Sequence, residues 1–349
     1  MIWKWFLDLF AGSYAGSGTA SASREVDNRL LQQQAKSIVH AIRIEDWSWL
    51  LSDILFAKGF DLIRLTAGLI LSGSGPCDVD STVGANKPLK DLSLGLVKCN
   101  VASIRFEKVT FAHGMRIRDG KNFTLTEEYV PHALAAVRHA VRHPHVNNEA
   151  IVIVGHSLGA YITPKLASLD DSIRKCVLLA CPARPVYYAA IGQFEYFAAM
   201  DDPSGQQPQP QIEELRKQAE LADSPHLNRK TPAKDLPFGL CPAYWLDCRN
   251  YNPLQDLTSC QKPILCLQGG RDYQVTSEDF DALIDSVEDK SSFKYILYED
   301  LNHLFISGRG PPTPLEYGTP GNVAEAVILE VARWCHDDSA DVDALFGRV

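Results

Sequence analysis

Short apolar segments alternate with longer amphipathic ones from about residue 66 to the C-terminal region. The short segments are rich in Val, Ile and Leu without polar alternation, as expected of parallel strands buried on both faces; they cover residues 67–71, 101–106, 150–154, 175–180, 263–267 and 293–298. The amphipathic segments have helical character and cover residues 89–98, 125–142, 158–169, 277–287 and 322–334. This alternation predicts an α/β fold with a doubly wound, mostly parallel sheet.

Two parts of the chain depart from the alternation. Residues 182–260 contain no convincing strand and are rich in Pro and Gln at 203–212, which predicts a helical lid inserted over the sheet. Residues 24–60 show apolar residues near a helical spacing, so we expect residues 1–65 to form a helical N-terminal extension. The core of the domain would then consist of residues 66–181 and 261–349.

Charge and cysteine content narrow the class of protein. The formal net charge of −9, from 34 basic and 43 acidic residues, argues against nucleic-acid binding. No apolar run reaches the roughly 18–20 residues that a transmembrane helix needs. The nine cysteines are odd in number and form no CxxC pair. Asp8 interrupts the apolar N-terminal stretch that a signal peptide would require. We therefore expect reduced, buried thiols and a cytoplasmic protein.

A serine flanked by glycines carries the clearest chemical signal. Residues 155–159 read Gly-His-Ser-Leu-Gly, directly after a predicted strand and at the start of a predicted helix. This G-x-S-x-G pattern is typical of a serine nucleophile on a sharp strand-to-helix turn, where larger flanking side chains would collide. The pattern predicts that Ser157 is a catalytic nucleophile.

A serine nucleophile needs a base and a carboxylate that orients the base. Asp272 and His303 each follow a later predicted strand, and nucleophile, acid and histidine occur in the chain order of hydrolases with this turn. Asp279 and Asp281 are rival acids, but both fall within the next predicted helix. We therefore predict a catalytic triad of Ser157, Asp272 and His303.

The same chemistry needs hydrogen-bond donors for an oxyanion. The backbone N–H of Leu158, directly after the nucleophile, is expected to be one donor at a helix N-terminus. The second is expected from the glycine-rich loop 71–76, with Ser74 the candidate and Gly75 the alternative. No metal-ligand spacing and no phosphate-binding glycine loop occur, so neither a metal nor a cofactor is expected.

At this point the chain resembles the α/β-hydrolase superfamily and, more narrowly, its EstD-like serine esterases, which are related to dienelactone hydrolases. The resemblance covers about residues 66–336 and is carried by the segments SGSGPCDVDSTVGANKPLKDL, GHSLGAY, CPARPVYYAAIGQFEYF, AYWLDCRNYNP, LQGGRDYQV, DLNHLF and GPPTPLEYGTPGNV. It implies an α/β-hydrolase fold and cofactor-independent hydrolysis of carboxylic esters through an acyl-enzyme. By motif match it implies the same three catalytic residues, Ser157, Asp272 and His303.

The chain also departs from this family pattern. Val79 stands where relatives tend to carry an arginine, and residues 106–109 read Phe-Glu-Lys-Val where relatives tend to have Tyr-Asp-Lys-Arg. The antiparallel strands usual before residue 66 are not recognisable in this sequence. These departures concern substrate preference and the edge of the sheet.

Aromatic residues in the inserted segment suggest how a substrate would be held. Tyr188, Phe194 and Trp245 are expected to line an apolar pocket, since exposing so many aromatics would be costly. The predicted function is a serine hydrolase of small-molecule esters or lactones. The alternatives are an acyltransferase or thioesterase acting on a carrier-bound or CoA-bound, polyketide-like chain in a biosynthetic pathway, and a non-catalytic binding protein.

Overall fold

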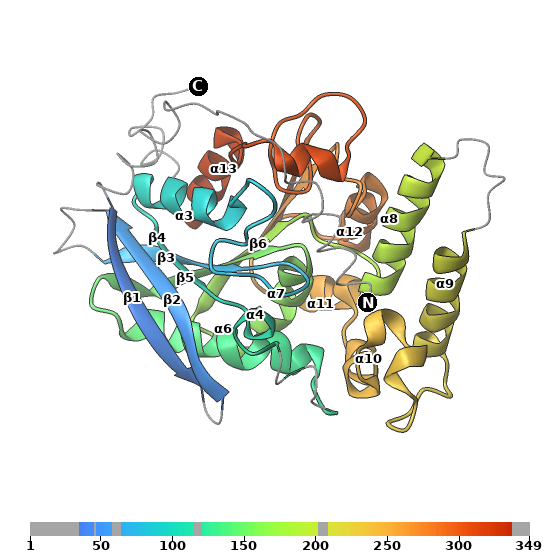
Figure 1. Ribbon diagram of the computed structural model, residues 1–349. Coiled ribbons are helices and arrows are strands. Elements are labelled where there is room, and N and C mark those ends of the chain that lie inside the picture. The colour runs from blue at the N-terminus through green and yellow to red at the C-terminus, as the bar shows by residue number, and fades with distance from the viewer. Residues whose placement is uncertain are drawn as a thin grey trace.

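One mixed sheet dominates the structure (Figure 1). The computed structural model describes residues 35–44, 47–57, 64–114, 117, 121–201 and 209–336, with only the backbone for residues 35–57. The strands are β1 (Ala35–Ile44), β2 (Trp47–Ala57), β3 (Leu65–Leu71), β4 (Ala102–Phe106), β5 (Val146–His156), β6 (Ile173–Leu179), β7 (Ile264–Gly269) and β8 (Phe293–Tyr298). Their order is β1-β2-β4-β3-β5-β6-β7-β8, with β3 to β8 parallel and β1 and β2 antiparallel. This confirms the predicted doubly wound, mostly parallel sheet.

Helices cover both faces of the sheet. They are α3 (Pro88–Lys98), α4 (Val109–Ala112), α6 (Leu125–Arg142), α7 (Leu158–Leu169), α8 (Val186–Asp201), α9 (Pro210–Asp223), α10 (Pro242–Cys248), α11 (Pro253–Ser259), α12 (Ser277–Ser286) and α13 (Glu325–Cys335). One apolar cluster joins α6, α7 and α12 to one face, and a second joins α3 and α13 to the other. No helix among the described residues combines the length and apolar character needed to cross a bilayer.

The N-terminal edge of the sheet corrects the sequence prediction. A helix was predicted over residues 24–60, but residues 35–44 and 47–57 form β1 and β2, while residues 1–34 lie outside the described part of the chain. β2 pairs antiparallel with β4, in the place where the expected edge strands were not recognisable. The run from Ile38 to Ile44 is rich in β-branched residues, which suit a strand better than a helix. Pairing with an existing sheet outweighs a weak helical spacing.

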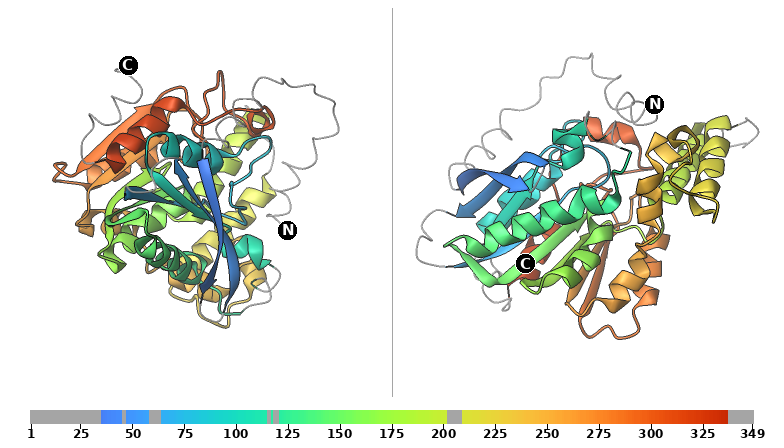
Figure 2. Two further views of the ribbon diagram at one scale, coloured as in Figure 1. Left: turned by 90° about the vertical axis from the view of Figure 1, so that its left-hand side faces the viewer. Right: turned by 90° about the horizontal axis from the view of Figure 1, so that it is seen from below.

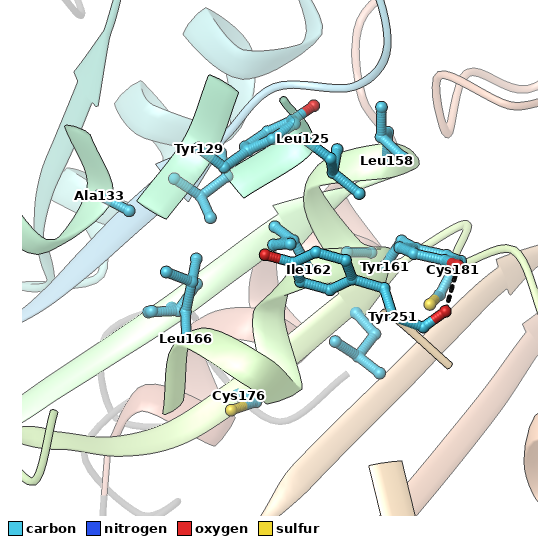
Figure 3. Packing of buried hydrophobic residues seen from close by; sticks show 14 of the residues in the cluster. Leu125, Tyr129, Ala133, Leu158, Tyr161, Ile162, Leu166, Cys176, Cys181 and Tyr251 are labelled. Atoms are coloured by element: carbon cyan, nitrogen blue, oxygen red, sulfur yellow. Dashed lines mark hydrogen bonds between the residues drawn. The ribbon is translucent and has the colours of Figure 1, made fainter. Parts of the chain in front are cut away.

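The helices α6 and α7 pack against each other next to the strand end that carries Ser157. Side chains of the two helices meet over β5 and β6, and Leu125, Tyr129 and Ile162 are buried among them (Figure 3). The Thr124 hydroxyl accepts from the Glu127 backbone N–H, closing a capping box that starts α6. The helix α7, which follows Ser157, therefore packs against a helix with a well-defined start.

Residues 182–260 are helical within their described part, as predicted. α8, α9, α10 and α11 lie between β6 and β7 in the sequence, and α8 to α10 gather beyond one end of the strands (Figures 1 and 2). The base of this inserted segment is fastened to the core, because the Arg184 guanidinium pairs with the buried carboxylate of Asp279 at 3.0 Å. Asp279, a rival acid in the sequence, is thus engaged in holding the insertion.

Candidate active site

Ser157 occupies a strained turn between β5 and α7. Its backbone has φ +55° and ψ −120°, a region that residues with a Cβ rarely adopt. The Ser157 N–H donates to the Leu179 carbonyl on the neighbouring strand, which holds the turn against the sheet. The predicted strand-to-helix turn is therefore present, and it projects the serine side chain beyond the end of the sheet.

The two glycines of the turn are required by close backbone contacts. A Cβ added at Gly155 would lie 2.4 Å from the Gly159 carbonyl oxygen and 2.4 Å from the Thr163 hydroxyl. A Cβ added at Gly159 would lie 2.6 Å from the Ser72 carbonyl oxygen. The second contact shows that the glycine-rich loop after β3 packs directly against the start of α7.

Asp272 and His303 meet at the carboxyl ends of β7 and β8. The His303 Nδ1 lies 2.6 Å from the Asp272 Oδ2, and both side chains are buried. The backbone N–H groups of Gln274 and Val275 donate to the other carboxylate oxygen at 2.8 and 3.0 Å. The carboxylate is thus fixed on one side, and the bond to Nδ1 leaves Nε2 of the imidazole for another partner.

A second histidine, in the turn itself, supports the loop that carries His303. The His156 Nε2 lies 2.8 Å from the His303 carbonyl oxygen, and since a carbonyl only accepts, the nitrogen donates. Burial lowers the pKa of His156 to about 3, so its imidazole stays neutral and keeps one N–H. The sequence offers no signal for this role, because His156 fills the variable position of the pentapeptide.

A cavity of about 700 Å³ opens over these residues. It brings together Ser157, His303, Leu158 and the loop residue Ser74, while Gly75 is not among the lining residues. Its remaining walls come from loops after β3 and β7, the histidine loop and the inserted segment: Gly73, Pro76, Cys77, Ser81, Thr82, Val83, Gly84, Ala85, His156, Pro182, Val186, Ala189, Ala190, Gln193, Phe238, Gln274, Val275, Leu304 and Tyr317. No Asp, Glu, Lys or Arg side chain lines it.

The aromatic residues expected to line the pocket lie elsewhere. Trp245 is buried in the core between Tyr187 and Tyr244, with ring centroids 5.3 and 5.2 Å away. Tyr188 is partly exposed and its hydroxyl bonds Asp223, while Phe194 packs against the main apolar cluster. These side chains hold the inserted helices together, because neighbouring aromatics bury more surface against one another than against an open cavity.

Smaller residues of the inserted segment line the cavity instead. Val186, Ala189, Ala190 and Gln193 contribute from α8, and Phe238 contributes from a later turn. Small side chains at this wall leave room for a substrate. Among the described residues, no group of three or more His, Cys, Asp or Glu side chains is placed to hold a metal ion.

The strand order, the strained serine turn and the Asp–His pair on later loops are the arrangement typical of α/β hydrolases. The sequence model of the Alpha/beta hydrolase family matches residues 109–309. The chain belongs to this family.

Comparison with individual proteins extends this result. The chain is 33% identical over 270 residues to Esterase EstD of Thermotoga maritima, a match that covers 77% of this chain and 61% of that relative. Two solved structures share the fold. Est1E from Butyrivibrio proteoclasticus matches with a TM-score of 0.51 and 16% identity, over 85% of this chain and 98% of that protein. A 2,6-dihydroxy-pseudo-oxynicotine hydrolase matches with a TM-score of 0.52 and 14% identity, over 94% of this chain and 76% of that protein.

Proposed function

We propose that the protein is a serine esterase that cleaves neutral carboxylic esters through an acyl-enzyme on Ser157. The hydrogen bond to Asp272 from His303, which lines the same cavity as Ser157, is the observation that carries this proposal. The 33% identity to an esterase supports it. A serine on a strained turn has little structural reason to be there, whereas nucleophiles are commonly presented in this way.

The proposed reaction begins with attack of the Ser157 Oγ on the ester carbonyl carbon. His303 Nε2 accepts the hydroxyl proton, and Asp272 keeps the imidazole in the tautomer that leaves Nε2 free. The oxygen of the tetrahedral intermediate is stabilised by the N–H groups of Leu158 and Ser74. The intermediate collapses, the alcohol leaves with the proton from His303, and water attacks the acyl-enzyme by the same steps.

The cavity favours neutral, largely apolar acyl groups. Its wall is rich in small apolar residues, and its polar members, Gln193, Gln274 and Tyr317 among them, are uncharged. A charged group bound there would lose its hydration without gaining a partner of opposite charge. A volume of about 700 Å³ is that of pockets for drug-sized ligands, so medium-length acyl chains and lactones fit.

Covalent labelling tests the nucleophile. The full-length protein would be incubated with a fluorophosphonate, digested and analysed by peptide mass spectrometry, with the Ser157→Ala protein as control. We expect one adduct on the peptide that contains Ser157 and none in the control. An unlabelled Ser157 in folded protein would contradict the proposal.

Lid variants test the acyl pocket. Ala190→Phe projects a ring into the cavity wall, whereas Ala199→Phe adds the same ring on the exposed side of the same helix. We expect the first to lower kcat/KM for long acyl esters far more than for acetate esters, and the second to leave the acyl-length profile unchanged. Equal losses at every acyl length in Ala190→Phe would contradict this pocket.

The products made with added alcohols or thiols distinguish hydrolysis from acyl transfer.

A further inference from the structure

The glycine-rich loop after β3 is held by its carbonyl groups from one side. Lys108, in the segment between β4 and α4, donates from its backbone N–H to the Cys77 carbonyl at 3.0 Å. Its ammonium donates to the Gly73 carbonyl at 2.7 Å, and the Thr110 hydroxyl donates to the Gly75 carbonyl at 3.1 Å. Three carbonyl groups of the loop, those of Gly73, Gly75 and Cys77, thus accept hydrogen bonds from this segment.

Lys108 is almost completely buried, which is rare for lysine. Its ammonium lies 2.6 Å from the carboxylate of Glu128, and the side chains are 2% and 4% exposed. The Tyr244 hydroxyl donates to the other Glu128 oxygen at 2.7 Å, so the carboxylate is also held from the inserted segment. An apolar pair of the same size would usually stabilise a fold as well as a buried ion pair does. Stability alone therefore does not explain why the Lys108–Glu128 ion pair is buried here, and we infer a further role for it.

Tyr129 completes the set of donors. Its hydroxyl lies 3.0 Å from the Ser72 carbonyl oxygen and 2.9 Å from the Gly73 carbonyl oxygen, and its ring packs under the Lys108 ammonium at 4.4 Å. Burial raises the pKa of Tyr129 well above its ordinary value, so the hydroxyl stays protonated and can only donate to these carbonyls.

The contacts of the Gly73 carbonyl determine the direction in which the Ser74 N–H points. In a planar trans peptide the C=O and the following N–H point to opposite sides. With the Gly73 carbonyl directed to Lys108 and Tyr129, the N–H of Ser74 points away from them. Ser74 lines the cavity, and a Cβ added at Gly73 would lie 3.1 Å from the Ser157 Cβ. The loop therefore passes directly beside the nucleophile.

We propose that Lys108 is a positioning residue of the oxyanion hole, whose ammonium fixes the Gly73 carbonyl so that the Ser74 N–H faces the substrate oxygen. Glu128 and Tyr129 fix the ammonium in turn. The cation also polarises the Gly73–Ser74 peptide, which strengthens its N–H as a donor. This inference rests on the proposed esterase function, and it assigns to Lys108 an effect on the transition state without contact to the substrate.

Two pairs of variants separate this role from a role in folding. Lys108→Met alone would leave Glu128 charged and buried, so we compare Lys108→Met/Glu128→Gln with Glu128→Gln, a contrast that isolates the lysine. Tyr129→Phe is compared with Tyr161→Phe, because the buried Tyr161 hydroxyl also donates to a backbone carbonyl, that of Tyr251 at 3.1 Å (Figure 3). Thermal unfolding of all four proteins reports the cost to stability.

The readouts are kcat per fluorophosphonate-titrated active site, KM for a neutral p-nitrophenyl ester, and Ki for a trifluoromethyl ketone that forms an oxyanion on the serine. We expect kcat to fall roughly 10- to 100-fold in the double variant relative to Glu128→Gln, and in Tyr129→Phe relative to Tyr161→Phe, as for a misaligned oxyanion donor. Ki should rise in parallel while KM changes less than about threefold, because the ground-state carbonyl needs this donor less than the oxyanion does.

The outcomes distinguish this inference from the function on which it rests. Wild-type protein that is not labelled at Ser157 overturns the esterase proposal and the role of Lys108 together. Labelled wild-type protein, with kcat per titrated site and Ki within threefold in both comparisons, overturns the role of Lys108 alone. In that case lower unfolding temperatures would assign the buried pair to stability.

Discussion

The backbone strain at Ser157 predicts that removing its Cβ stabilises the protein. Ser157→Ala and Ser157→Gly both remove the hydroxyl of the proposed nucleophile, but only glycine adopts φ +55° and ψ −120° without strain. Such a conformation costs about 1–3 kcal/mol for a residue with a Cβ. Glycine in turn loses about 0.4–1 kcal/mol through the greater freedom of the unfolded chain. The difference leaves Ser157→Gly more stable than Ser157→Ala by about 1 kcal/mol.

Thermal and urea unfolding of the two variants measure this difference in stability. For a chain of this size, about 1 kcal/mol corresponds to a Tm shift of roughly 1–2 °C. The alanine variant is the matched control, because it keeps the Cβ and loses only the hydroxyl. A glycine variant no more stable than the alanine variant would refute the argument that the turn stores strain.

Three further predictions follow from the buried contacts of the site and the core. Burial lowers the pKa of His132 from 6.5 to about 4. Between these pH values the unfolded chain binds more protons than the folded one, so stability falls as pH falls. From pH 7 to pH 5 the urea midpoint of His132→Gln should therefore decrease less than that of the wild type, and an equal decrease would count against this prediction. Gly159→Ala places a methyl 2.6 Å from the Ser72 carbonyl oxygen and 2.8 Å from the Leu71 carbonyl oxygen, so it should displace the glycine-rich loop after β3. We expect kcat to fall by at least about tenfold in a steady-state ester assay, and wild-type turnover would argue against the close packing. A p-nitrophenyl half-ester of a dicarboxylic acid should show kcat/KM at least about 100-fold below the neutral ester of equal length, and similar values would contradict the uncharged wall.

The parallel part of the fold could be predicted from the sequence because its strands are short apolar runs, and those at the centre of the sheet, such as β3 and β7, are almost completely buried. The predicted runs at 67–71, 150–154 and 293–298 all lie within strands of the sheet. The two antiparallel strands, β1 and β2, were misread as helix, since their apolar residues also fit a helical spacing and the pairing of β2 with β4 is a tertiary contact. Local spacing carries no information about such a partner.

The same distinction holds for the site. Ser157, Asp272 and His303 could be proposed from the sequence because a serine-hydrolase triad would demand fixed residue types after successive strands, and the structure brings the last two into contact. The aromatic residues of the inserted segment were assigned to the pocket on their apolar character alone. Trp245 is instead buried against Tyr187, because the core offers it more contacts. Lys108 gives only a faint signal, a lysine two residues beyond a buried strand, and its partners are set by the fold.

Direct observation of the acyl-enzyme tests the central claim most closely. The full-length protein would be mixed with a neutral ester, quenched in acid during turnover and measured by intact and peptide mass spectrometry. We predict a mass increase equal to the acyl group, located on the peptide that contains Ser157. The fraction of acylated protein should be larger in Asp272→Asn if this substitution slows deacylation more than acylation. Turnover of the ester without any adduct on Ser157, together with activity retained in Ser157→Ala, would contradict the account.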